Sequence, residues 1–311
     1  MAQSSLPLVR VGTRGSPLAL AQAEEVRGRL AAACGLDPQT IALRIIRTTG
    51  DRIQDRPLAE AGGKGLFTKE IEQALLDGEI DLAVHSAKDL PTWLPPGLVI
   101  AGYLPREDVR DVFIARKAAS LADLPRGAVV GTASLRRQAL VKRRRPDLQV
   151  IPFRGNVETR LRKLAEGQVD ATLLALAGLK RLGRSDVATA ILSVEEFPPA
   201  IGQGAIALEA RADDARICAF VAAINDPDTA TAVTAERAFL AALEGSCRTP
   251  IAGHAHILEG RLHFHGLIVK PDGSELHETT RSGAPAEAAT LGENAGRELR
   301  RRAAPDFFGP G

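Results

Sequence analysis

Residues 128–137 read AVVGTASLRR, and this stretch decides the fold class of the chain. Its three apolar residues predict a short strand, GTAS (131–134) predicts a turn, and the residues from Leu135 onward predict a helix. The same order occurs at residues 8–30, where LVRV and the turn TRGSP precede apolar residues at helical spacing. Alternating strands and helices predict α/β lobes with mainly parallel sheets.

Further units of this kind flank the stretch. Strands are expected at 42–46, 81–85, 149–153 and 171–174, and a helix is expected over 66–76. In such sheets ligands bind at the carboxyl ends of the strands. The polar turns that follow these strands are therefore the expected place for a site.

The pattern changes after about residue 226, where helices and alternating strands replace the earlier units. We expect a helix, three strands and a final helix, over 230–243, 255–258, 262–269, 275–280 and 286–302. PDG (271–273) between the last two strands predicts a hairpin turn. This part of the chain is expected to form a small α+β domain.

Length and composition limit the classes of protein to consider. The chain has 311 residues, of which 45% are hydrophobic, enough for two or three domains. Its three cysteines, Cys34, Cys218 and Cys247, are widely spaced, so neither a disulfide framework nor a metal motif is expected. The N-terminus does not resemble a signal peptide, and no apolar run reaches the roughly 18 residues that span a bilayer. We expect a soluble, cytoplasmic protein.

Positive charge is concentrated in the middle of the chain. Residues 134–163 carry a net +8, whereas the whole chain carries +2. Runs such as KRRR (142–145) are usually exposed faces. Arg136, Arg137 and Arg154 differ, because each follows a strand near the start of a helix, where free N–H groups favour anions. Arginine forks match carboxylates, so a pocket for a ligand with several carboxylates or phosphates is predicted.

Polar residues occupy the other turns too. Thr132 and Ser134 add hydroxyl groups, one of which is expected to cap the following helix. In the first lobe, Arg14 and Ser16 lie in one strand-to-helix turn, and Lys64 lies in GGKG before another helix. GGKG lacks the spacing of a nucleoside-triphosphate loop, so an anionic small molecule is expected rather than a nucleotide.

Asp89 follows Lys88 at the end of the strand in DLAVHSAKDLP (81–91). An aspartate at such a position often only caps a turn. A carboxylate among anion-binding groups would instead serve cationic or N–H-bearing chemistry. The substrate would then carry acids at its edge and develop positive charge at its centre.

Cys247 lies in a turn after a helix, next to Arg248. Both features favour an accessible thiolate. No histidine lies within three residues of it, and a Cys–His nucleophile, although still possible through space, has no other support.

These motifs together resemble those of the hydroxymethylbilane synthase (porphobilinogen deaminase) family. In chain order they are TRGSPLALAQ, GGKGLFTKE, DLAVHSAKDLP, GTASLRRQ, RGNVETRL, LAGLKRLG, PAIGQGAIALE and LEGSCRTPI. The resemblance runs from about residue 8 to residue 255.

The resemblance implies two α/β lobes like those of periplasmic binding proteins and a small C-terminal domain that carries the cofactor. Lobe 1 would comprise 1–104 and 205–225, lobe 2 would comprise 105–204, and the cofactor-attachment domain would comprise 226–311. Movement would occur at a hinge near 202–204.

It also implies a transferase of haem and tetrapyrrole biosynthesis. Such an enzyme condenses four porphobilinogen molecules, each losing ammonia, on a dipyrromethane joined to Cys247 by a thioether, and water then releases hydroxymethylbilane. Asp89 would stabilise the azafulvenium cation that forms from porphobilinogen. Porphobilinogen and the growing polypyrrole chain are the implied partners, with no nucleic acid, no membrane and no metal, and a monomer is implied.

The resemblance assigns residues to three roles. The catalytic residues would be Asp89 and Lys88. The cofactor-binding residues would be Cys247, Lys88, Asp89, Thr132, Ser134, Arg136, Arg137 and Arg154. The substrate-binding residues would be Arg14, Ser16, Lys64, Arg154, Arg160 and Gln203.

Two other classes of protein are considered. A two-lobed sensor or solute-binding module without catalysis would bind an anionic ligand reversibly and give Cys247 no role. A nucleic-acid binder is disfavoured by the near-neutral charge and by the single Tyr and Trp, because stacking platforms are scarce.

Overall fold

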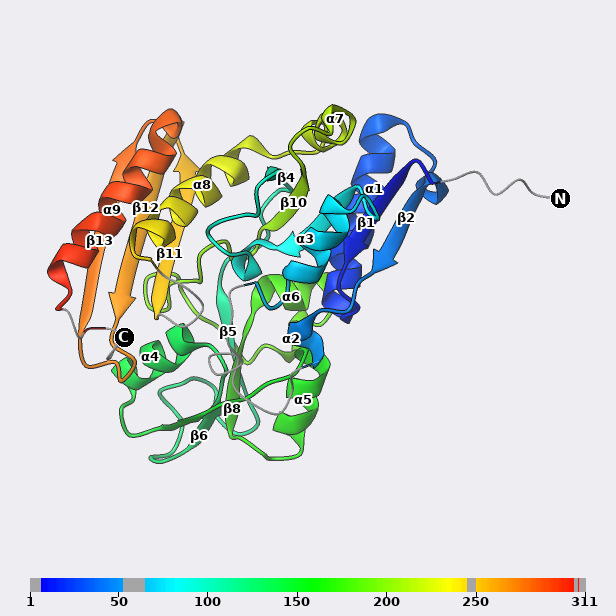
Figure 1. Cartoon of the computed structure of the whole chain (residues 1–311). Helices are drawn as coiled ribbons and strands as arrows, with labels where there is room; N and C mark the ends of the chain where they lie inside the picture. The colour runs from blue at the N-terminus through cyan, green and yellow to red at the C-terminus, as the bar shows by residue number, and fades with distance from the viewer. Residues whose placement is uncertain (1–6, 53–64, 245–249, 305–306, 308–311) are drawn as a thin grey trace. The chain divides into compact units, whose positions relative to one another are not determined.

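The computed structural model describes residues 7–52, 65–244, 250–304 and 307 (Figure 1). Its contacts divide the chain into two compact units. Among the described residues, unit 1 comprises 7–52, 65–106 and 205–230, and unit 2 comprises 107–204 and the residues from 231 onward.

Unit 1 is built on a five-stranded sheet with the order β2-β1-β3-β10-β4. Its strands are β1 (Val9–Thr13), β2 (Ile41–Ile45), β3 (Leu82–Ser86), β4 (Leu98–Tyr103) and β10 (Ile206–Arg211). β1 pairs in parallel with β2 and β3, whereas β10 runs antiparallel between β3 and β4. The sequence predicts the three parallel strands but neither β4 nor β10.

Helices cover both faces of this sheet. The helices of unit 1 are α1 (Pro17–Cys34), α2 (Thr49–Arg52), α3 (Lys69–Leu76) and α7 (Ala215–Ala222), and α1, α3 and α7 provide this cover. Ser16 caps α1 by accepting a hydrogen bond from the Ala19 backbone N–H. Val84 packs in one core with residues of α1 and α7, whereas Ala83 packs with Ile71 of α3. Since neighbouring strand residues point to opposite faces, α3 lies on the opposite face from α1 and α7.

Unit 2 contains a second five-stranded sheet, with the order β7-β6-β8-β5-β9. Its strands are β5 (Asp111–Ala115), β6 (Val129–Gly131), β7 (Gln149–Ile151), β8 (Ala171–Ala175) and β9 (Ala190–Ile191). Its helices are α4 (Leu135–Arg144), α5 (Val157–Ala165) and α6 (Leu176–Arg181). β6 pairs in parallel with β7 and β8, whereas β5 runs antiparallel to β8 and β9. The predicted α/β class with mainly parallel pairing is confirmed around β6.

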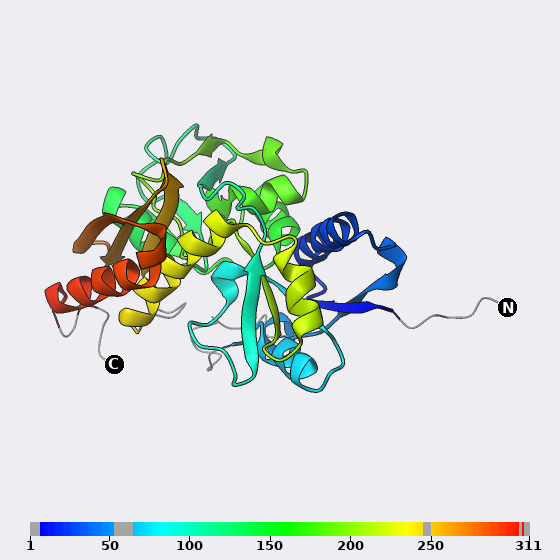
Figure 2. The same cartoon turned by 90° about the horizontal axis from the view of Figure 1, so that it is seen from above.

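The C-terminal part of unit 2 is an antiparallel meander with two helices. Its elements are β11 (Ile251–Leu258), β12 (Arg261–Val269), β13 (Leu276–Gly283), α8 (Pro227–Ala242) and α9 (Ala288–Arg302). The two helices run side by side next to the strands (Figures 1 and 2). Phe239 of α8 and Phe264 of β12 lie with ring centroids 5.0 Å apart in their shared core. The predicted small α+β domain is therefore confirmed.

The other face of the meander packs against helix α4. Ala252 and Leu267 form a buried cluster with Ala139 of α4. The hairpin turn predicted at 271–273 forms next to this cluster, with Gly273 at a φ of 78°. A Cβ atom at Gly273 would lie 2.8 Å from the Ala139 carbonyl oxygen. Glycine is therefore required there both by the backbone conformation and by the close approach of α4.

The chain passes from one unit to the other near residues 106 and 204, and again within α8; the first two segments are hydrogen bonded to each other. The Leu104 N–H donates to the Ile206 carbonyl at 3.2 Å within unit 1, and the Glu107 N–H donates to the Gly204 carbonyl at 3.2 Å within unit 2. The predicted hinge residue Gly202, with a φ of 71°, donates its N–H to the buried carboxylate of Glu236 at 2.6 Å. The segment 202–204 is thus fastened to unit 2.

None of the helices in the described ranges combines the length and the apolar character that a membrane crossing requires.

Candidate functional site

The predicted site residues of unit 1 gather at one edge of its sheet. Ser16 follows β1, and Lys88 and Asp89 follow β3. Because these strands are parallel neighbours, both turns lie at their shared carboxyl edge. The buried amide of Gln22 in α1 donates to the Ser86 hydroxyl at the end of β3 at 2.9 Å, which joins the helix after the first turn to the strand before the second.

The turn that carries Asp89 is a short 3₁₀ segment, Ala87–Asp89. Ala87 and Leu90 are buried, whereas Lys88 and Asp89 between them are exposed. The Ala87 N–H donates to the Ala205 carbonyl at 3.0 Å, which fastens the turn to the residue that precedes β10. The fold therefore presents the Asp89 carboxylate to solvent on an anchored backbone.

Arg14 lies over an aromatic ring of the same unit. Its guanidinium carbon is 4.1 Å from the ring centroid of Phe67, in the LFTKE segment that follows GGKG. Such stacking orients a cationic fork. Lys64 lies outside the described residues, and so does Cys247 of unit 2.

The predicted residues of unit 2 also share one sheet edge. Thr132 and Ser134 follow β6, Arg154 follows β7, and these strands are parallel neighbours. Ser134 caps α4 by accepting a hydrogen bond from the Arg137 N–H at 3.4 Å. The hydroxyl of the buried Thr132 accepts from the Ser134 N–H at 3.2 Å. The prediction that one of the two hydroxyls caps the helix is confirmed for Ser134.

Arg136 and Arg137 converge on a carboxylate that sequence reasoning missed, Asp111. Arg136 Nη2 lies 2.7 Å from Asp111 Oδ2, and Arg137 Nη2 lies 2.7 Å from Asp111 Oδ1. The remaining contacts of the two arginines include the backbone carbonyls of Pro198 and Leu173, at 2.7 and 3.0 Å. All three charged side chains are buried. Many of the guanidinium N–H donors that we expected to bind a ligand therefore bind groups of the protein.

The charges of this cluster do not balance. Burial would raise the pKa of Asp111, but the two guanidiniums outweigh burial and hold that pKa well below its usual range. Asp111 is therefore ionised, and it offsets one of two positive charges. Burial lowers the pKa of Arg136, with the Arg137 charge acting in the same direction. One positive charge is left over among the three buried groups.

Arg160 of α5 adds to this excess. Its side chain is partly buried, and its Nε is buried without a hydrogen-bond partner. Burial, together with the nearby charge of Arg137, lowers its pKa to about 10. No carboxylate pairs with Arg160 within the part of the chain that the structure describes. Arg136, Arg137 and Arg160 thus outnumber the single carboxylate, which is the electrostatic arrangement that an anionic ligand would complete.

Gln203 and Arg154 occupy different environments. Gln203 is fully buried, and its Nε2 donates to the Val109 carbonyl at 2.7 Å and to Asp111 at 2.8 Å. It therefore binds the crossing segment to the start of β5. Arg154 is partly exposed, and its carbonyl accepts from Lys163 at 3.2 Å. A contact of either side chain with ligand stays a prediction.

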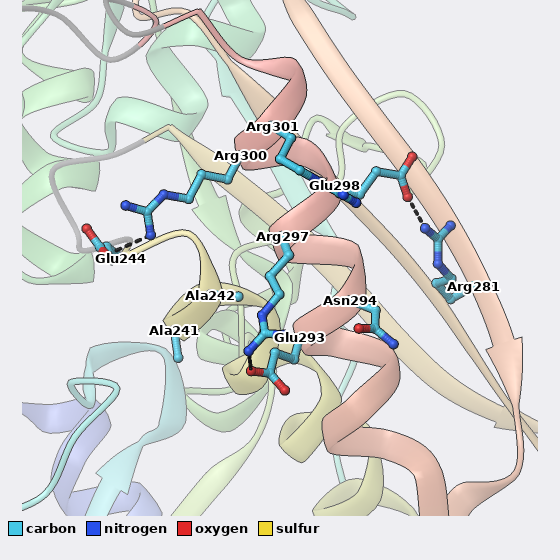
Figure 3. Close-up of a pocket in the computed structure, with 10 residues that line it drawn as sticks. All are labelled: Ala241, Ala242, Glu244, Arg281, Glu293, Asn294, Arg297, Glu298, Arg300 and Arg301. Atoms are coloured by element: carbon cyan, nitrogen blue, oxygen red, sulfur yellow. Dashed lines mark hydrogen bonds and ion pairs between the residues drawn. The ribbon is translucent and has the colours of Figure 1, made fainter.

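A hollow of about 950 Å³ lies beside α9, and its lining includes Glu244, three residues before Cys247 (Figure 3). Three of its four arginines are paired with glutamates: Arg300 Nη1 lies 2.7 Å from Glu244 Oε1, Arg297 pairs with Glu293, and Arg281 pairs with Glu298. None of the predicted site residues that the structure describes lines it. Because most of these charges are paired, the hollow has little attraction for an anion, so we do not place the site there. In the described ranges, no three His, Cys, Asp or Glu side chains are arranged to hold a metal ion.

Asp111, Gln22 and Phe67 are the residues of these two edges that sequence reasoning missed. A signal existed for Asp111, since RDVFIA places an aspartate directly before an apolar run, and a charge buried with such a strand requires a cationic partner. No local pattern marks Gln22 or Phe67.

Comparisons with known proteins give a consistent result. A sequence profile described as "Porphobilinogen deaminase, dipyromethane cofactor binding domain" matches residues 9–219, and one described as "Porphobilinogen deaminase, C-terminal domain" matches residues 230–301. A porphobilinogen deaminase of Nitrobacter winogradskyi is 64% identical over 97% of this chain and 95% of its own length. A porphobilinogen deaminase of Paracoccus denitrificans is 57% identical, covering 96% of each chain.

Solved structures with similar folds include a putative methionine-binding lipoprotein of Bacillus subtilis, with a TM-score of 0.42 and 15% identity over 70% of this chain and 90% of that one. A periplasmic substrate-binding protein of an ABC transporter from Coxiella burnetii has a TM-score of 0.44 and 17% identity, over 71% of this chain and 93% of that one. The two sequence profiles span most of the chain, and the named relatives match it over nearly its whole length. The chain therefore belongs to the porphobilinogen deaminase (hydroxymethylbilane synthase) family.

Proposed function

We propose that the chain condenses four porphobilinogen molecules head to tail, with loss of ammonia at each step, and releases the linear tetrapyrrole hydroxymethylbilane. Membership of the family supports a transferase of tetrapyrrole biosynthesis. The structural observation that carries the proposal is the excess of buried arginine charge around Asp111, because each added pyrrole ring brings two carboxylates. A sensor without catalysis is not favoured by the family.

A dipyrromethane attached to Cys247 fits the residues that surround this excess. The partly buried Arg160, with an Nε that lacks a hydrogen-bond partner, offers a donor and a charge for a carboxylate. Arg154, Ser134 and Thr132 belong to the same sheet edge and would add donors. When bound, the group supplies the nucleophilic pyrrole carbon from which the chain grows.

Asp89 is the proposed catalytic carboxylate. It is exposed on an anchored turn, so it can approach a pyrrole N–H and oppose the positive charge that develops as porphobilinogen loses ammonia. Lys88 beside it would bind a substrate carboxylate. Arg14, Ser16 and Lys64 would bind further substrate carboxylates from the same unit.

The experiment measures the intact mass and the turnover of three proteins. The parent should carry the mass of a dipyrrole and convert porphobilinogen. Cys247→Ala should lose both properties, whereas Asp89→Ala should keep the added mass and lose at least about 99% of turnover. A parent without the adduct that cannot acquire it from porphobilinogen would refute the proposal. Unchanged turnover in Asp89→Ala would remove Asp89 from the mechanism.

We further infer a three-domain organisation, with boundaries at 1–104 and 205–225, 105–204, and 226–311, in a monomer of the cytoplasm. The presence of three separate sheets supports the three domains. Limited proteolysis that releases fragments ending near these boundaries would support them, and sedimentation at the mass of one chain would support the monomer.

A further inference from the structure

Three buried titratable side chains of unit 1 have no part in the proposed chemistry. They are His85 of β3, Glu209 of β10 and Glu72 of α3. His85 Nε2 lies 3.0 Å from Glu209 Oε2, and these side chains are 4% and 0% exposed. Three titratable side chains buried together require a physical explanation, because a buried charge is costly unless it is paired.

The three side chains occupy the same face of the sheet. Ala83 of β3 packs against Ile71 of α3, and His85, two residues further along the strand, points to the same face. Glu209 pairs in register with Ala83, so it also faces α3. Glu72 approaches from α3 and interacts electrostatically with both Glu209 and His85. The buried Tyr103 of β4 shares this face through its pairing with Ala207.

The two glutamates differ in how they approach His85. Glu209 Oε2 lies 3.0 Å from His85 Nε2, whereas Glu72 reaches the pair from α3. Burial raises the pKa of Glu72, and the adjacent Glu209 adds to the rise. Each glutamate has one buried oxygen, Oε1 in both cases, without a hydrogen-bond partner. Glu209 is therefore the glutamate that contacts His85 directly.

This pair lies directly before the turn that carries Asp89. β3 ends at Ser86 and continues into Ala87–Asp89, and Ala205, which accepts from the Ala87 N–H, leads into β10. The His85–Glu209 contact joins β3 to β10 beside the point where Ala87 binds Ala205. A shift of one strand against the other would therefore displace the Asp89 backbone.

We propose that Glu209 and His85 are positioning residues, and that their contact holds the end of β3 so that the Asp89 carboxylate is correctly placed. This inference rests on the proposed function of Asp89. A merely stabilising role would leave kcat of the folded protein unchanged, whereas a positioning role requires kcat to fall when the contact is lost. The proposal also requires that replacing Glu209 lowers kcat more than replacing Glu72, although both glutamates are buried.

The test compares Glu209→Gln with Glu72→Gln in the holoenzyme that carries its covalent adduct. Glu72→Gln leaves the His85–Glu209 contact in place, so it should keep kcat and KM within twofold of the parent. Glu209→Gln replaces the carboxyl group that lies 3.0 Å from His85 Nε2 with an amide. We expect its kcat to fall at least tenfold while KM stays within threefold, because substrate carboxylates are bound by other residues. Intact mass should show the same adduct in both variants.

Two further variants complete the experiment. His85→Gln, which removes the partner from the other side, should reproduce the selective loss of kcat and serves if Glu209→Gln does not fold. Asp89→Ala and the parent serve as the inactive and active references. The positioning role would be overturned if folded Glu209→Gln or His85→Gln had a normal kcat. If the parent were active and Asp89→Ala inactive in the same experiment, the proposed function would remain intact. Equal losses in Glu72→Gln and Glu209→Gln would overturn the claim that the direct His85–Glu209 contact is what positions Asp89. A parent without turnover would refute the proposed function itself.

Discussion

Replacing Asp111 with asparagine removes the single carboxylate from the buried arginine cluster of unit 2. Asp111 is fully buried and accepts hydrogen bonds from Arg136, Arg137 and Gln203. Asparagine keeps one acceptor oxygen but turns an N–H₂ group toward donors, and it leaves both guanidiniums without a compensating charge. Loss of one partner of a buried ion pair costs about 3–5 kcal/mol. For a chain of this size, that corresponds to a fall in Tm of roughly 10 °C.

The pH dependence provides a second measurement of the same effect. The pKa of Asp111 is lowered in the folded state, so its contribution is fully present above the unfolded value of about 4 and is lost as pH falls through the folded value. Urea unfolding should therefore show the full difference between Asp111→Asn and the parent at pH 7. The difference should shrink as the pH falls below about 4.

Asp147→Asn is the matched control. Asp147 pairs with Arg145 at 2.8 Å, but both side chains are partly exposed, so solvent screens the pair. Its removal should lower Tm much less than Asp111→Asn does. If Asp111→Asn unfolds within about 1 kcal/mol of the parent at pH 7, the ion-pair reasoning for this cluster is wrong.

Two other substitutions test the unpaired charge and the packing of the C-terminal domain. Arg160→Gln should lower kcat/KM by at least about tenfold, because it removes a hydrogen-bond donor for a ligand carboxylate, and it should not lower the free energy of unfolding. Arg162→Gln, on the exposed side of the same helix, is the control. Equal kinetics in the two variants would contradict the role of Arg160. Gly273→Ala should lower the free energy of unfolding, measured by chemical denaturation, by about 1–3 kcal/mol. The loss should exceed that of Gly260→Ala, because Gly260 has a similar positive φ but open space around it. Equal losses in the two variants would mean that the contact with α4 is unimportant.

Sequence reasoning found the parallel parts of the fold because a strand followed by a polar turn and a helix leaves a local pattern. The turns after β1, β3, β6 and β7 were predicted in this way. β5 and β10 were missed, since each begins directly after a crossing between the units and no helical pattern sets it apart. Their antiparallel pairing to β8 and β3 depends on residues distant in the chain, which periodicity does not reveal.

The candidate site shows the same division between local and distant information. The positions of Arg136 and Arg137 near a helix start could be read from GTASLRR, and Ser134 caps that helix as expected for one of the two hydroxyls. Their binding to Asp111 could not, because Asp111 is the first residue of β5, more than twenty residues earlier in the chain. The spacing of residues in the sequence therefore predicts which side chains lie at the site. It does not predict how much of their charge other groups of the protein neutralise.

The buried carboxylate of Glu236, which binds Gly202, also binds a second backbone group of unit 2. One of its oxygens accepts from the Gly202 N–H at 2.6 Å, and the other accepts from the Ala255 N–H of β11 at 2.8 Å. A single side chain of α8 thus joins two segments that lie more than fifty residues apart in the chain. Glutamine at this position would offer one acceptor oxygen to two N–H groups, so one of these backbone donors would lose its partner.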